Sequence, residues 1–165
     1  MCSFFCFKMH SSHTLELFPE LNVTQILFKE VQNAAELRKN AIDGKIQGAL
    51  INPTMKTNKM KTRSLFSEII FNLSPTNNIS EAFKRFGISD GDDSVLVVLI
   101  HDKDESPLVT DIATKVDGLQ IPVDEMCSLS NFEKIKKLYK VTPQEEKCGT
   151  LQDAVICRMA TKDVM

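Results

Sequence analysis

The run at residues 95–100, V-L-V-V-L-I, constrains the fold more than any other segment of this 165-residue chain. Six consecutive apolar residues follow neither the helical nor the alternating period, and the run is far shorter than a membrane span. Such a run is typical of a central strand that is buried on both faces of a sheet. We therefore expect a single α/β (α+β) domain in which helices cover a mixed β-sheet.

Short β-rich and amphipathic segments alternate around this strand, which agrees with that architecture. We expect strands at 14–18, 23–28, 46–51 and 67–73. We expect helices at 34–43 and 79–86, three further helices that begin near residues 106, 130 and 142, and a final helix over the last segment. Asn33 and Asn78 stand at helix starts, each with a Glu three residues later, as in a capping box. Gly44 and Gly87 follow these two helices, and we expect Gly87 to be left-handed.

The last predicted helix offers a surface for a partner. Its apolar residues Leu151, Val155 and Met159 face inward at helical spacing, whereas Ile156 lies off that stripe. An exposed apolar side chain on a helix suits a partner surface. Gly149, just before the helix, indicates either that a helix restarts there or that another backbone comes close.

Composition excludes several classes of function. The formal net charge is −2, so any contact with nucleic acid requires a local basic patch, and nothing favours an anionic membrane. The five cysteines form no C-x-x-C pair and no zinc-finger spacing, which indicates reduced thiols and no metal site. Cys157 lies within a helical pattern and fits a core thiol.

Catalytic motifs are absent from the sequence. It has no phosphate-binding glycine loop, no H-E-x-x-H, no G-x-S-x-G and no kinase signature set. His101 is followed by Asp102 and Asp104, which is one candidate acid–base site. The alternative is the solvated start of a loop, which the sequence favours because nothing nearby orders a nucleophile.

Two groups of cations are candidate RNA contacts. The first contains Lys56, Lys59, Lys61 and Arg63, and the second contains Lys134, Lys136, Lys137 and Lys140. Each group can neutralise a few phosphates, although the sequence favours an ordinary solvated face for each group taken alone.

Four segments together resemble the family of small kinase-binding subunits of the KEOPS complex. They are L-F-P-E at 17–20, L-I-N-P-T at 50–54, the stretch at 61–88 and the tail at 149–163. The resemblance runs from residue 14 to the end and is weaker between residues 102 and 129. The family domain is expected over 13–165, after a variable extension at 1–12.

The resemblance implies an accessory subunit rather than an enzyme. Members of this family bind the N-terminal lobe of PRPK, a small atypical kinase. The complex makes threonylcarbamoyladenosine beside the tRNA anticodon, and the subunit supports the kinase and helps hold tRNA, notably its 3′ end. We therefore expect no catalytic residue, cofactor, metal or membrane contact, and a location in cytosol and nucleus.

The resemblance also directs the choice of site residues. For the kinase we select Asn77, Asn78, Ile79, Lys84, Arg85 and Ile156, and for RNA we select Lys59, Lys61, Arg63, Lys134 and Lys137. Ile79 fits core packing equally well, because it lies on the apolar stripe of its helix.

The chain departs from the family after Asn52-Pro53. The family has an apolar helix there, whereas Thr54 leads almost directly to Met60, which leaves the chain roughly twenty residues short, enough for one helix. This loss looks like a skipped segment in an alternative product. If the helix covers about 400 Å² of apolar surface, its loss costs on the order of 10 kcal/mol. We therefore expect a weakened, aggregation-prone domain with an exposed sheet face.

Three functions from different classes follow from these observations. The first is an adaptor for the KEOPS kinase. The second is a stand-alone RNA-binding module that uses the two basic groups, and it predicts a steep salt dependence without any kinase. The third is an enzyme centred on His101, which predicts an activity that His101→Ala abolishes.

Overall fold

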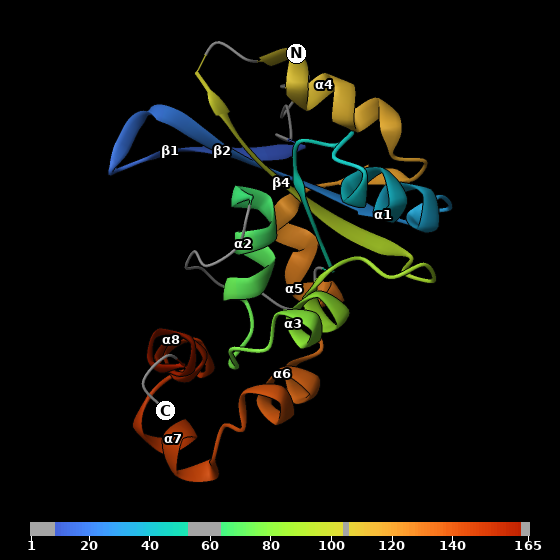
Figure 1. Cartoon of the computed structure of the whole chain (residues 1–165). Helices are drawn as coiled ribbons and strands as arrows, with labels where there is room; N and C mark the ends of the chain where they lie inside the picture. The colour runs from blue at the N-terminus through green and yellow to red at the C-terminus, as the bar shows by residue number, and fades with distance from the viewer. Residues whose placement is uncertain (1–8, 53–63, 104–105, 163–165) are drawn as a thin grey trace, which may run out of the picture.

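The computed structural model describes residues 9–52, 64–103 and 106–162, which form one antiparallel sheet and its covering helices (Figure 1). The strands are β1 (His10–Leu15), β2 (Phe18–Lys29), β3 (Ala49–Ile51), β4 (Ser94–Asp102) and β5 (Leu119–Ile121). Their order is β1-β2-β4-β3, with β5 beside β2. The prediction of a single α/β domain is confirmed. Every strand pairing among the described residues is antiparallel, so the sheet is not of mixed direction.

The helices occupy both faces of this sheet (Figure 1). They are α1 (Ala34–Ile42), α2 (Leu65–Asn72), α3 (Ile79–Phe86), α4 (Ser106–Lys115), α5 (Met126–Leu129), α6 (Phe132–Tyr139), α7 (Pro143–Cys148) and α8 (Leu151–Thr161), with a short 3₁₀ helix at Val123–Glu125. None of the helices in the described part of the chain is both long and apolar enough to cross a bilayer.

Strand β4 is buried on both faces, as the apolar run predicts. Val95, Val97 and Leu99 belong to one core cluster, which includes residues of α1 and α4. Leu96 and Val98 belong to a second cluster on the other face, formed with α2, α3, α6 and α8. The alternation of side chains along a strand therefore divides the interior into two layers. The second layer carries the elements on which most of the candidate site residues lie.

The strand predicted at 67–73 is wrong, because this segment forms helix α2. Ser64 caps the helix, and its hydroxyl accepts a hydrogen bond from the backbone N–H of Ser67 at 3.1 Å. The outer edge of β3 is met by the backbone of residues 86 and 87, and Asn52 N–H donates to Phe86 at 2.8 Å. With that edge occupied, a β-rich segment buries its apolar residues as a helix, since strand propensity depends on context.

The other strands agree with the predictions in place but differ in length. Strand β1 starts at His10, within the extension expected at 1–12, and a turn at Glu16 and Leu17 separates it from β2. Strand β2 runs without a break through residues 19–22, which lie between the two strands expected at 14–18 and 23–28. The strand expected at 46–51 shortens to β3.

Two predictions made for helix ends are wrong. Asn33 does not cap α1, because its side chain bonds the backbone of Lys115 and Asp117 at 2.9 and 3.0 Å. Gly87 is extended rather than left-handed, and a Cβ there would lie 2.7 Å from the carbonyl oxygen of Phe83. Gly44 has φ +72°, the left-handed conformation that ends a helix.

Gly149 marks a helix restart, one of the two alternatives for this position. It is extended between α7 and α8, and each of these helices begins with a capping box. Thr142 pairs with Glu145 in the first box and Thr150 with Asp153 in the second. The reciprocal bonds satisfy backbone N–H groups that a helix start otherwise leaves unpaired.

Candidate functional site

The turn before α3 and the start of α3 carry three of the predicted kinase-binding residues. Asn78 is the N-cap, and its side chain accepts from the backbone N–H of Glu81 at 3.1 Å, as predicted. The side-chain amide of Asn77 donates to the backbone carbonyl of Lys162 at 3.0 Å. The side chain of Ile79 is 48% exposed, so core packing does not account for it. The turn before α3 is thus tied directly to the residue that follows α8.

The last turn of α3 carries two further predicted residues, and they differ in charge balance. Arg85 is paired with Glu81, one turn earlier, at 2.5 Å. Lys84 forms no ion pair with the described residues, and its side chain is exposed. Lys84 is therefore the better ligand for an external anion.

Helix α8 presents Ile156 to solvent. Its side chain is 46% exposed, whereas Met159 is buried and Val155 packs against the second core cluster. The sequence prediction that Ile156 lies off the inward stripe is confirmed. Cys157 is also exposed, so the prediction of a core thiol is wrong.

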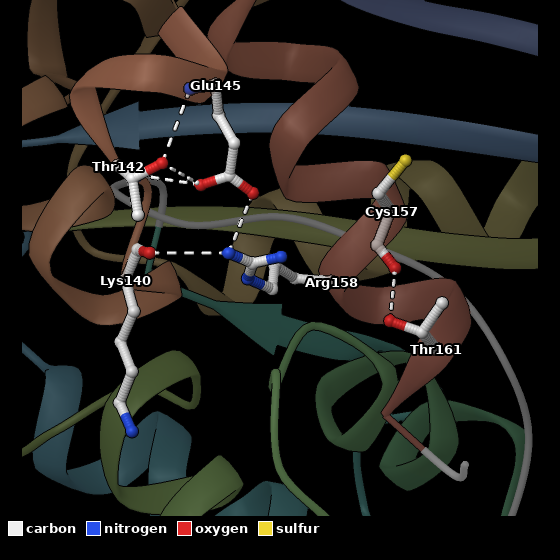
Figure 2. A network of polar contacts seen from close by, with 6 residues as sticks. All are labelled: Lys140, Thr142, Glu145, Cys157, Arg158 and Thr161. Atoms are coloured by element: carbon white, nitrogen blue, oxygen red, sulfur yellow. Dashed lines mark hydrogen bonds and ion pairs between the residues drawn. The ribbon is translucent and has the colours of Figure 1, made fainter. Parts of the chain in front are cut away.

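One side chain fixes α8 against the segment that joins α6 to α7 (Figure 2). The guanidinium of Arg158 lies 2.7 Å from the carboxylate of Glu145 and donates to the backbone carbonyl of Lys140 at 3.5 Å. Lys140 is the left-handed residue that ends α6, with φ 51°. Figure 2 shows that Glu145 also receives the backbone and hydroxyl bonds of Thr142. Arg158 therefore sets the position of the helix that carries Ile156.

Both capping-box carboxylates are held in the charged form. The backbone N–H of Thr142, then its hydroxyl, and the nearby charge of Arg158 lower the pKa of Glu145. The hydroxyl of Thr150, then its backbone N–H, lower the pKa of Asp153. Hydrogen bonds to a carboxylate favour ionisation, so these helix starts depend on charged acids.

A basic groove of about 720 Å³ separates α3 from α6. It brings Lys84 and Arg85 of α3 together with Lys134 and Lys137 of α6, roughly fifty residues apart in the chain. Asn52, Asn78, Ser80, Glu81, Ser89, Asp92 and Leu138 complete the lining. We call this site the basic groove. It joins residues predicted for two different partners.

The basic groove has a net positive charge, because its lining contains four cations and two acids. Its acid Glu81 pairs with Arg85, and Asp92 accepts from the backbone N–H of Ser89 at 2.7 Å. Lys84, Lys134 and Lys137 have no ion pair in the described part of the chain. Three unpaired ammonium groups around one groove favour an anion with several phosphates.

Lys136, between the two groove lysines of α6, has acidic partners of its own. Its ammonium lies 2.6 Å from Glu146 and 3.6 Å from Glu133. The hydrogen bond that its ammonium donates to Glu146 is the main cause that raises the pKa of Lys136 above its usual value. The first basic group, Lys56, Lys59, Lys61 and Arg63, lies outside the described residues, so its role stays a prediction.

His101, the centre of the enzyme hypothesis, is buried and bonded at both ring nitrogens. Nδ1 donates to the backbone carbonyl of Asp102 at 2.7 Å, and Nε2 lies 2.9 Å from the hydroxyl of Thr24. Thr24 also bonds Ser12 at 2.8 Å. These contacts link β1, β2 and β4, so the imidazole has a structural role; Asp104 lies outside the described residues.

Sequence reasoning missed the basic groove and the Arg158 link. Each depends on elements far apart in the chain, and no local period or cap relates α3 to α6. The charges of Arg158 and Glu145, thirteen positions apart, form a signal only once α7 and α8 are placed side by side.

The comparisons with known proteins agree among themselves. The model of the family described as "Kinase binding protein CGI-121" matches residues 54–163. The chain is 59% identical over 174 residues to the EKC/KEOPS complex subunit TPRKB of Danio rerio, covering 94% of this chain and 99% of that protein. It is 31% identical over 160 residues to the EKC/KEOPS complex subunit cgi121 of Aspergillus terreus, covering 79% and 82%. It is 33% identical over 138 residues to CGI121 of Kluyveromyces lactis, covering 72% and 87%.

Proposed function

Because the chain belongs to the CGI-121 family of kinase-binding proteins, we propose that it is a non-catalytic subunit of an EKC/KEOPS complex. In this role it binds and supports the kinase subunit, PRPK. The observation that carries the proposal is the identity with TPRKB of Danio rerio, which extends over 99% of that protein. The family match itself includes every element from α2 to α8.

We place the kinase contact on the start of α3, together with the turn before it, and on α8. Ile79 and Ile156 are aliphatic residues, each about half exposed, on these two elements. The bond from Asn77 to Lys162 joins the turn to the segment after α8. Apolar side chains on joined, rigid elements provide the desolvated centre that a stable protein interface needs.

Co-purification with PRPK tests this proposal. The chain and TPRKB of Danio rerio are each immobilised and exposed to the kinase at micromolar concentration. Retention by both supports a kinase surface within the elements that this chain possesses. No retention by this chain, beside retention by the relative, contradicts kinase binding for this chain.

For the tRNA role we propose that the basic groove contacts the phosphate backbone, as the substrate is held for threonylcarbamoyladenosine formation. Lys84, Lys134 and Lys137 are unpaired cations within the described residues that converge from α3 and α6. Each phosphate that is neutralised adds about 0.7 to 0.9 to the slope of log K against log salt. Replacement of all three lysines by Gln should therefore lower this slope by about two to three.

Lys136→Gln is the matched control for the tRNA test. Lys136 lies on the same helix, but Glu146 and Glu133 already neutralise it. The salt slope of this variant should equal that of the unmodified chain. An unchanged slope in the triple variant would contradict an RNA contact in the groove.

The basic groove also favours the alternative function, a stand-alone RNA-binding module. This alternative predicts tight, salt-dependent binding of tRNA by the chain alone, whereas the adaptor requires the kinase. Titration of tRNA with and without PRPK separates the two, because only the adaptor gains affinity from the kinase.

A further inference from the structure

A second groove, of about 990 Å³, lies at the outer edge of β3, between α1, α2 and α3. Its lining is largely apolar and includes Ile42, Ile46, Phe66, Ile70, Phe83 and Ile88. We call it the apolar groove. Ile42 is 75% exposed and Phe83 is 37% exposed, so large apolar side chains on two walls meet water. A monomeric surface rarely leaves such a concave apolar area open.

The chain lacks residues that the Danio rerio relative possesses. The alignment with TPRKB of Danio rerio spans 174 positions, more than the 165 residues of this chain, so that protein has residues that this chain lacks. That alignment covers 94% of this chain, yet the family match starts only at residue 54, directly after Asn52-Pro53. The two observations point to a break in the alignment just after β3. Leu50 of β3 and Ser64, the N-cap of α2, both line the groove.

We propose that the apolar groove is the site against which the relative packs the segment that it carries after β3. In this chain the groove binds that segment when it is supplied as a separate amphipathic helix. The inference does not depend on kinase binding. It concerns a site that the described residues leave open.

Backbone hydrogen bonding favours a helix as the occupant. The outer edge of β3 is already met, since Ile51 pairs with Gly87 and Asn52 N–H donates to Phe86. An added strand therefore lacks a free edge there, whereas a helix satisfies its backbone groups internally. The rim of the groove is polar, with Lys84, Ser64 and the ion pair of Arg38 with Asp90 at 3.0 Å. An apolar floor under a polar rim fits a helix with one apolar face.

The test is a titration with a fluorescent peptide that carries the residues of the Danio rerio protein opposite the gap. The unmodified chain should bind the peptide saturably, and the melting temperature should rise with peptide concentration. A scrambled peptide of the same composition should not bind. TPRKB of Danio rerio, whose own segment fills the groove, should bind the peptide at least tenfold more weakly.

Two variants place the binding in the groove. Ile42→Asp should weaken peptide binding at least tenfold without unfolding the chain, because this side chain is already three-quarters exposed. Phe83→Asp, on the opposite wall, should act in the same direction. Leu119→Asp, at a 52% exposed residue of β5, is the matched control and should bind as the unmodified chain does.

Three results would overturn the proposal. One is the absence of saturable peptide binding. Another is binding that Ile42→Asp and Phe83→Asp leave unchanged. The third is a dimer of this chain that both variants dissociate and the peptide does not, which would make a second copy the occupant.

Discussion

At the scale of single residues, Ile156 is the sharpest test of the kinase surface. Ile156→Glu places a charge at the centre of the proposed contact and should weaken PRPK binding at least about tenfold. The melting temperature should stay within about 2 °C, because the side chain is half exposed. Leu119→Glu, an equally exposed apolar residue on β5, is the control in the same binding assay. Equal binding by both variants would remove α8 from the interface.

Gly87 gives a second prediction at this scale. Gly87→Ala should lower the free energy of unfolding by about 1–3 kcal/mol, because the new Cβ would meet the carbonyl oxygen of Phe83 at 2.7 Å. Gly91→Ala is the matched control, since no atom lies within 4 Å of a Cβ there. Urea unfolding of both variants measures the difference. Equal stability would show that the backbone at Gly87 relaxes freely.

Single residues also show where sequence reasoning stops. A glycine after a helix suggests a left-handed end, and Gly44 obeys this rule. Gly87 does not follow this rule. A side chain is excluded there because the carbonyl oxygen of Phe83, in the preceding helix, lies too close, while the backbone of Gly87 pairs with Ile51. The exposure of Ile156 follows from helical period alone and was predictable.

At the scale of elements, the starts of α7 and α8 predict a dependence of stability on acid. The pKa values of Glu145 and Asp153 are lowered in the folded state. Their contribution is therefore full above the ordinary pKa values of 4.5 and 3.8 and is lost as the pH falls through the lower folded values. In urea unfolding, the double variant Glu145→Gln, Asp153→Asn should be less stable than the unmodified chain at pH 7. The gap should narrow as the pH falls below these ordinary values, and a gap that acid leaves unchanged would contradict the capping role.

Helices that begin with a recognisable N-cap residue were predictable from the sequence. Asn78 and Thr142 act through residues three positions away, so their helices, α3 and α7, could be placed in advance. Helix α2 could not, because its β-rich composition is overruled by the occupied edge of β3. Asn33 was misread for a similar reason, since the end of α4 takes its side chain.

At the scale of the whole molecule, the open apolar groove predicts reduced stability. This chain should melt at least about 10 °C below TPRKB of Danio rerio, which corresponds to roughly 3 kcal/mol or more for a domain of this size. Calorimetry of both proteins in one buffer measures the difference. A cooperative transition within a few degrees of the relative would contradict a loss of stability at the groove.

The overall architecture was partly predictable because one apolar run identifies the central strand. The buried β4 dictated two layers of helices, and the structure has them. The basic groove could not be predicted, since it requires knowing that α6 returns beside α3. The linear sequence does not indicate that lysines some fifty residues apart lie close together in the folded protein.

The bonds of Lys162 to the α2–α3 region affect how the protein is made. The ammonium of Lys162 donates to the carbonyl of Phe71, 91 residues earlier, and its own carbonyl accepts from Asn77, 85 residues earlier. At about 5–20 residues per second, a ribosome needs roughly 5–20 s to add that length of chain. During this time α2 and α3 lack their last partner, and their apolar faces are open to chaperones. The second layer of the domain is therefore completed only after residue 162 has been synthesised.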